Sequence, residues 1–184
     1  MPNNVANMLH AARRSMEEMI VPALEGANPL AREQAQLVIQ ALGFVEAQLP
    51  YLHAKDRAEM IAYADIANDV LALDLTGTDQ NLVTALRQSL DNARRLEAEH
   101  NPASSDLQQA AKALADALGA LVRALGTLSA QSRLAVRKAV VSGTERVLDI
   151  HRAFFLPTGF DKAATSLPPL ASLLHGEDRA SARA

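Results

Sequence analysis

Residues 101–128 read NPASSDLQQAAKALADALGALVRALGTL, and this stretch decides the fold class. Asn101-Pro102 is a typical helix-start signal. After it, apolar residues recur at alternating intervals of four and three positions, which is the spacing of one face of an α-helix. Those positions are Leu107, Ala111, Leu114, Leu118, Leu121, Leu125 and Leu128. The stretch therefore predicts one regular helix with a buried seam.

Three further helix-start signals, Asn28-Pro29, Pro50 and Thr78 before Asp79, divide the chain before this stretch. The apolar residues between them also recur every three or four positions, and no run shows the two-residue period of a strand. Connections of a few residues make consecutive helices antiparallel. We therefore predict an all-α fold, an antiparallel bundle of about six helices with up-and-down connectivity. Besides the helix after Pro102, the expected helices cover residues 4–25, 29–49, 51–75, 79–99 and 129–155.

The first two helices are each expected to turn one apolar face toward the core of this bundle. In the first helix the face consists of Val5, Leu9, Ala12, Met16, Met19 and Ala23. In the second it consists of Leu30, Leu37, Val38, Ala41, Leu42, Val45 and Leu49. Pro22 either kinks the end of the first helix or begins a short separate turn.

The last long helix carries two adjacent apolar rows. One row, expected in the core, is Val136, Val140, Gly143, Val147, Ile150 and Phe154, and the second is Leu134, Val141, Leu148 and Phe155. Together they are wider than one small bundle covers, and monomeric proteins seldom leave such a patch in water. The second row therefore predicts a homodimer or a contact with a partner protein. On the helix before it, a stripe of Ala115, Gly119 and Gly126 predicts that something packs close against that face.

The character of the chain changes after Pro157. We predict a helical bundle domain over residues 1–156 and an irregular or partly disordered tail over residues 157–184. In the tail, Leu170 to Leu174 can form one amphipathic turn. Its leucines, Leu173 and Leu174 among them, either dock in a groove of another chain or pack back on their own bundle.

Composition excludes several classes of protein. The 184 residues contain no cysteine, which removes disulfides, thiolate nucleophiles and cysteine-bound metals. A net charge of -3 argues against nucleic acid as a partner. The longest uncharged stretch, residues 34–45, is too short to span a bilayer, and no secretory signal is visible at the N-terminus. We therefore expect a soluble cytoplasmic protein.

Two pairs of ligand-type residues suggest metal chemistry without completing a site. Glu97 and His100 have the spacing used in di-iron helical bundles, but the second pair that such sites need is missing. Asp65 and Asp69 have the spacing of carboxylates that hold Mg²⁺ against a diphosphate, yet an acidic face in contact with solvent explains them better. We expect no metal and no cofactor.

One ionisable cluster and one basic segment remain as candidate sites. His10, Arg13, Arg14 and Glu17 lie close together in the first helix and are the candidate ligand-binding residues. The simpler interpretation is that they flank the edge of the core. Arg133, Arg137 and Lys138 follow a turn that resembles a helix-turn-helix entry, but their helix is too long and too apolar for a recognition helix. These cations more simply lie against the acidic third helix or face solvent.

The sequence favours a non-enzymatic interaction or scaffold protein that associates with itself or with a partner protein through its fifth and sixth helices. Aromatic residues make up only 3% of the chain, and narrow alanine-leucine interfaces leave little room for a large cofactor pocket. The alternative is a binder of a small apolar ligand, or an auxiliary subunit of an enzyme system, with His10, Arg13 and Arg14 near the ligand. No motif identifies a family.

Overall fold

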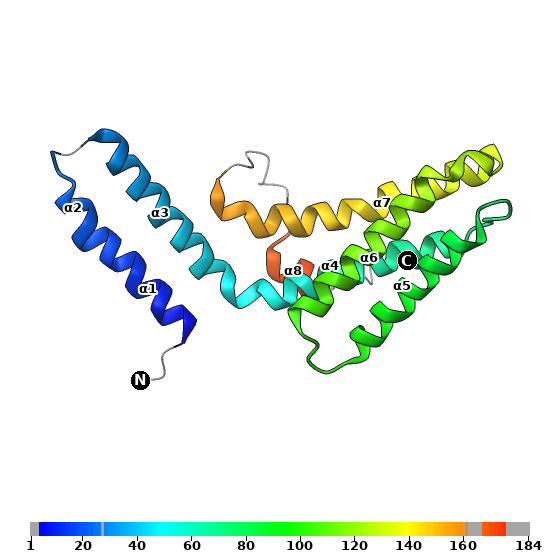
Figure 1. Ribbon diagram of the computed structural model, residues 1–184, viewed down its shortest axis with the longest axis horizontal. Coiled ribbons are helices and arrows are strands. Elements are labelled where there is room, and N and C mark those ends of the chain that lie inside the picture. Colours follow the sequence, from blue (N-terminus) through cyan, green and yellow to red (C-terminus); the bar gives the residue numbers. More distant parts are fainter. Residues whose placement is uncertain (1–3, 27, 160, 162–166, 176–184) are drawn as a thin grey trace. The chain divides into compact units, whose positions relative to one another are not determined.

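The computed structural model describes residues 4–26, 28–159, 161 and 167–175. These residues form helices and, within the described ranges, no strand, which confirms the all-α prediction. Six long helices follow one another in the predicted order (Figure 1). The first consists of α1 (Val5–Ser15), a π-helical turn (Met16–Ile20) and α2 (Val21–Ala23), and the others are α3 (Pro29–Gln48), α4 (Leu52–Leu71), α5 (Gln80–Ala98), α6 (Ser104–Arg123) and α7 (Ala130–Phe155).

Helices α3 and α5 begin where the sequence predicts, and in each of them a side chain satisfies one of the first backbone donors. At the start of α3, Asn28 Oδ1 accepts a hydrogen bond from the Leu30 backbone N–H at 3.0 Å, and Pro29 occupies the first turn. At the start of α5, Asp79 Oδ1 accepts one from the Asn81 backbone N–H at 2.9 Å. Each cap satisfies a donor that has no partner inside the helix.

The chain divides into two compact units. The first comprises residues 1–52 and 155–162, and the second comprises residues 53–154 and 163–184. The predicted single domain over residues 1–156 and tail over residues 157–184 stay a prediction, because compactness alone does not establish which parts fold independently.

In the first unit, α1, the π-helical turn and α2 pair with α3 as an antiparallel helical hairpin (Figure 1). Pro22 lies in α2, which continues from the π-helical turn with helical backbone angles at Ile20 and Val21, and the helix ends after Ala23. Gly26, in the connection to α3, has a φ of 85°, a conformation that glycine adopts without strain.

The predicted burial of the first two helices is wrong. Among the described residues of this unit, Ala35 and Gln48 alone are buried. The large apolar side chains expected in the core are partly buried or exposed, and the exposed ones are Val5 at 60%, Met19 at 68%, Leu30 at 59%, Leu37 at 50%, Val38 at 45% and Val45 at 42%. The reason is that two helices cover only one side of each other.

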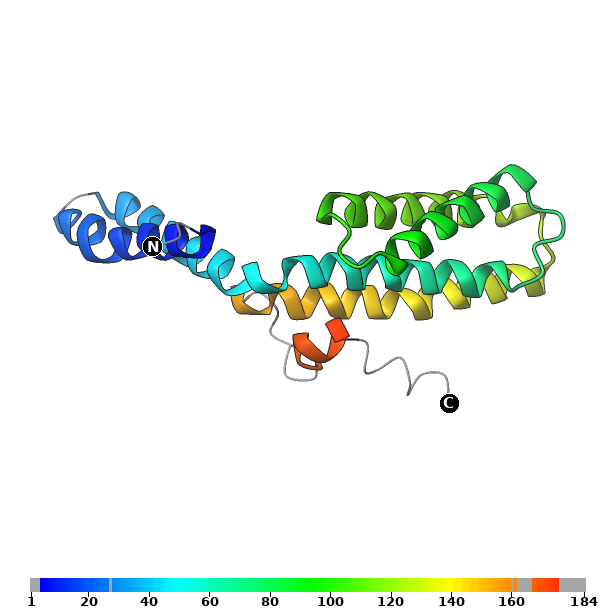
Figure 2. The ribbon, with the colours of Figure 1, turned by 90° about the horizontal axis from the view of Figure 1, so that it is seen from below.

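The second unit is a four-helix bundle built from α4, α5, α6 and α7. Figure 2 shows α4 and α7 side by side, with α5 and α6 on one side of this pair. On the other side lies the short helix α8 (Leu170–His175), the amphipathic turn that the sequence predicts in the tail. Leu173 of α8 is 4% exposed and belongs to the core of this bundle.

The core of the second unit follows the predicted helix faces closely. All seven seam residues of the stretch at residues 107–128 are buried, with exposures of 5% or less. On α7, the first apolar row is buried or partly buried, whereas the second row is exposed. Full burial of a leucine side chain contributes roughly 2 kcal/mol, so this seam supplies much of the stability of the bundle.

The predicted close contact at the glycine stripe of α6 is wrong. A Cβ atom on Gly119 would meet only the guanidinium of Arg123, and one on Gly126 would meet nothing within 4 Å. The close approach occurs instead at Gly143 of α7, where the Ile66 side chain of α4 occupies the space of a Cβ. Among the described helices, none is long and apolar enough to cross a membrane.

Candidate functional site

The ionisable cluster predicted on the first helix assembles around a residue of α3. His10 Nδ1 lies 2.9 Å from Glu46 Oε1, and Arg13 Nε donates to Glu46 Oε2 at 2.9 Å. Arg13 also donates through Nη1 to Glu17 Oε1 at 2.8 Å. The structure therefore brings together three of the four predicted residues. The fourth, Arg14, pairs with Glu18 at 2.8 Å instead.

Glu46 is the member of this cluster that sequence reasoning missed. The hydrogen bonds from Arg13 and His10 lower the pKa of Glu46 below its usual range. The hydrogen bond to Glu46 is in turn the main reason that the pKa of Arg13 is raised. Glu46 is the first charged residue after the long uncharged stretch at residues 34–45, which is the only signal that marks it in the sequence.

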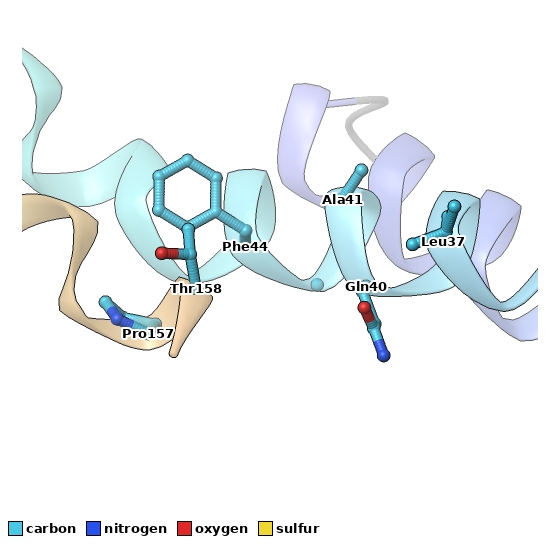
Figure 3. A pocket seen from close by; sticks show the side chains of 7 residues that line it. Leu37, Gln40, Ala41, Phe44, Pro157 and Thr158 are labelled. Carbon is cyan, nitrogen blue, oxygen red and sulfur yellow. The ribbon is translucent and has the colours of Figure 1, made fainter. Parts of the chain in front are cut away.

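A groove lies on α3 in the same unit. It encloses about 650 Å³ and is lined by Leu37, Gln40, Ala41, Gly43, Phe44, Pro157 and Thr158. Figure 3 shows the α3 side chains following one another along the helix, with Pro157 and Thr158 of the turn after α7 at one end. A Cβ atom on Gly43 would lie 3.7 Å from Arg13 Cδ, so the ionisable cluster adjoins this groove.

The second apolar row of α7 is exposed, as the sequence predicts for a contact surface. Leu134 is 69% exposed, Val141 is 65% exposed and Leu148 is 55% exposed. We call these three residues the α7 row. Because they recur every seven positions, they lie on one side of the helix. Phe155, at the end of the same helix, stacks on Phe44 with 5.6 Å between ring centroids.

The two tail leucines lie against their own bundle. Leu173 is buried in the core of the second unit, and Leu174 is partly buried against it. Of the two arrangements considered for this segment, the structure shows the one in which it packs back. These two residues therefore offer less free surface than the α7 row.

A buried polar cluster joins the first half of α4 to its neighbours. Asp56 is only 1% exposed, and its Oδ2 accepts a hydrogen bond from Gln108 Nε2 at 2.9 Å. Glu59 pairs with Lys55 on its own helix and with His151 of α7, whose Nε2 lies 3.0 Å from Glu59 Oε1. The acidic residues at the start of α4 thus join three helices of the bundle.

Burial and pairing act in opposite directions on Glu59. Burial raises the pKa of Glu59, but the hydrogen bonds from Lys55 and His151 outweigh it, and the pKa is lowered overall. Tyr63, one turn further along α4, has a raised pKa because it is partly buried and faces the negative charge of Glu59. The cluster is therefore arranged to hold Glu59 in its charged form.

The remaining candidate pairs are engaged in contacts between helices. The backbone carbonyl of Glu97 accepts a hydrogen bond from Arg57 of α4. Asp65 and Asp69 line a depression together with Lys138 and Arg146 of α7, so one of the predicted cations does lie beside the acidic helix. Within the described residues, no three histidine, aspartate or glutamate side chains are placed to hold a metal ion.

No protein-family model matches the chain, and no curated protein or solved structure matches it.

Proposed function

We propose that this chain is a non-enzymatic interaction or scaffold protein and that the α7 row is one of its contact surfaces for another protein. The exposure of Leu134, Val141 and Leu148 supports this proposal, because the core of the second unit is complete without them. Three large apolar side chains in one line on a stable helix are a liability for a protein that stays alone in water.

The surroundings of the α7 row agree with a contact surface. Exposed charged residues, Arg137, Lys138 and Glu145, lie beside it on the same helix. An apolar centre with a charged rim is the usual composition of a protein–protein interface, in which the rim excludes water and selects the partner. Both signs of charge are present, so the row suits a partner with a mixed rim.

We further propose that the protein is a homodimer in a cytoplasmic setting, as its composition suggests. Sedimentation and native mass spectrometry of freshly purified protein test self-association. A species of twice the 19.7 kDa chain mass is expected at micromolar concentration. A monomer would remove the homodimer and leave a different protein as the partner.

The α7 row itself is tested with the double variant Val141→Lys and Leu148→Lys. Both positions are exposed, so lysine leaves the helix content and the unfolding midpoint nearly unchanged. Affinity purification from cells that naturally express the protein compares the two forms. The proposal expects an associated chain in stoichiometric amount with the unmodified protein and its loss with the double variant. Equal recovery with both forms contradicts a role of the α7 row.

The groove on α3 supports a second candidate function, the binding of a small apolar ligand. Its volume of about 650 Å³ is in the range of ligand sites, its walls include Leu37 and Phe44, and Arg13 adjoins it. Arg13 and His10 are, however, already paired with Glu46. Native mass spectrometry tests this candidate through a retained small molecule, which Ala41→Trp should displace by filling the groove.

A further inference from the structure

The N-terminal hairpin has two chemically different faces. On one face, Arg13 and His10 of α1 reach Glu46 of α3, and Arg13 lies over Gly43. Each residue of a helix is turned by about 100° from the one before it. Residues turned to one side of the contact line between α1 and α3 therefore share one face of the hairpin, and residues turned to the opposite side share the other face. The ion pairs therefore fix which residues of both helices lie together on that second face.

The second face is apolar and uncharged. It contains Val5, Met8 and Ala12 of α1 and Ala31, Val38 and Val45 of α3, all of them exposed. We call these six residues the hairpin face. On each helix they follow intervals of three, four or seven positions, as expected for one side of a helix. The residues between Glu33 and Glu46 include no charge, and the polar side chain on this side of α3 is Gln34, which the same spacing places between Ala31 and Val38.

The hairpin has too little buried core to be a finished unit. Ala35 and Gln48 alone are buried among its described residues. An element with so small a buried core gains stability when another surface covers its apolar face. Two such hairpins that join their apolar faces form an antiparallel four-helix bundle, in which each helix is covered on two sides.

The exposed area agrees with a dimer contact. Seven large apolar side chains on and beside the hairpin face are 42–68% exposed, namely Val5, Met8, Met19, Ile20, Leu30, Val38 and Val45. Together they present on the order of 700 Å², close to the ~800 Å² that each partner contributes to a standard interface. An uncharged face is also complementary to itself, since its partner needs no opposite charges.

We infer that the hairpin face is the self-association surface of this protein and that its occupant is the hairpin face of a second copy. The contact is isologous, with the two copies related by a two-fold axis. It leaves the α7 row free for a different protein. This inference rests on the proposed role as an interaction protein, and it assigns the two surfaces to different partners.

The test compares three double variants of the full chain, each of which introduces two lysines at exposed positions. Val38→Lys with Val45→Lys changes the hairpin face. Gln36→Lys with Ala47→Lys adds the same charge to the other side of α3 and is the matched control. Val141→Lys with Leu148→Lys changes the α7 row. All six positions are exposed in the single chain, so circular dichroism should show unchanged helicity.

Sedimentation equilibrium at micromolar concentration is expected to give a dimer for the unmodified protein, for the matched control and for the α7 variant. The hairpin variant is expected to be monomeric, with its dissociation constant raised at least ~100-fold by the burial of unpaired lysines. A monomeric unmodified protein overturns the inference. A dimer that survives the hairpin variant and is lost in the α7 variant also overturns it, while the proposed interaction role of the α7 row stands.

Thiol cross-linking gives a second measurement that does not depend on lysine. The chain has no cysteine, so a single introduced cysteine reports only on its own position. Val38 lies at the middle of α3, where a two-fold axis through the hairpin face brings the two copies close together. With a short bis-maleimide, Val38→Cys is expected to give a covalent dimer and Gln36→Cys is not. Equal cross-linking at both positions contradicts the inference.

Discussion

Gly143 of α7 lies directly against Ile66 of α4, and a Cβ atom at position 143 would come within 2.3 Å of Ile66 Cγ1. Ile66 is 2% exposed and is held by the core on its other sides. The absence of a side chain at Gly143 therefore allows α4 and α7 to approach each other at this point. The same pair of helices carries the contact between Glu59 Oε1 and His151 Nε2.

Gly143→Ala should lower the free energy of unfolding by about 1–2 kcal/mol, because overpacking costs more than the gain in helix propensity. Chemical denaturation of the full chain measures the change. Gly119→Ala is the matched control, since its Cβ meets only the flexible end of Arg123 and the helix gains up to ~1 kcal/mol. If both variants gain stability, the contact between α4 and α7 is looser than described.

Leu118→Asp should destabilise the protein by about 4 kcal/mol or more. Leu118 is 4% exposed at the centre of the α6 seam, so the substitution removes a buried leucine and inserts an unpaired charge. Thermal and chemical unfolding measure the loss. Ala113→Asp changes an exposed position of the same helix and is expected to stay within about 1 kcal/mol of the unmodified protein. Similar losses in both variants would contradict the assignment of the seam.

Glu59 predicts a pH dependence of stability. The pKa of Glu59 is lowered in the folded chain, so the unfolded chain binds the proton more readily. The contribution of charged Glu59 to the free energy of unfolding is therefore fully present at pH values above 4.5, the ordinary pKa of a glutamate side chain. That contribution is lost as the pH falls from there through the lower folded pKa. Unfolding free energies of Glu59→Gln, compared with the unmodified protein between neutral pH and pH ~3, should show a difference that shrinks in this window.

Asp116→Asn is the control for that experiment, because Asp116 pairs with Lys112 in an exposed position, with its side chain 67% exposed. Exposed pairs contribute little to stability, so this variant should follow the pH profile of the unmodified protein. A Glu59→Gln profile parallel to that of the unmodified protein throughout the acidic range would show that the pairing with Lys55 and His151 does not stabilise the fold.

Leu173→Ala should release α8 from the second unit. Leu173 is the buried residue of this short helix, and its truncation should cost about 2–3 kcal/mol of the docking energy. Limited proteolysis should then cleave within residues 167–175 faster than in the unmodified protein. Ala171→Ser, at an exposed position of the same helix, should leave the cleavage rate unchanged. Equal rates in all three proteins would indicate that α8 does not depend on this contact.

Helix positions were predictable because their signals are local. Asn28 and Asp79 cap their helices through backbone groups two residues away, and such contacts depend only on neighbouring residues. The burial of the α6 seam was predictable for a related reason, because a strict repeat of leucines places all of them on one face of the helix, and that face is then the one that packs into the core. The exposure of the α7 row was predictable in the same way. The first apolar row of α7 is enough to fill the core, so a second row beside it is left over.

The site residues contributed by distant segments were not predictable. Glu46 joins His10 and Arg13 across more than 30 positions, and Gln108 meets Asp56 across 52. Asp56 has the sequence environment of a surface carboxylate, and only the packing of α6 against α4 buries it. Spacing within one helix shows which residues share a face, but not which other helix meets that face.

By itself, the sequence determined the order of the helices and the residues on each apolar face, because hydrogen bonding and amphipathic periodicity are local properties. It overestimated the length of two helices, since α4 ends at Leu71 rather than near residue 75 and α6 ends at Arg123, before a 3-10 turn. The tertiary structure alone decided which faces are covered. It buried the α6 seam and left the equally periodic hairpin face in water, although both carry the same kind of apolar spacing. The physical reason is that burial depends on the number of neighbours a helix has. Helix α6 packs within a four-helix bundle, whereas α1 and α3 are the two long helices of their unit and pack mainly against each other.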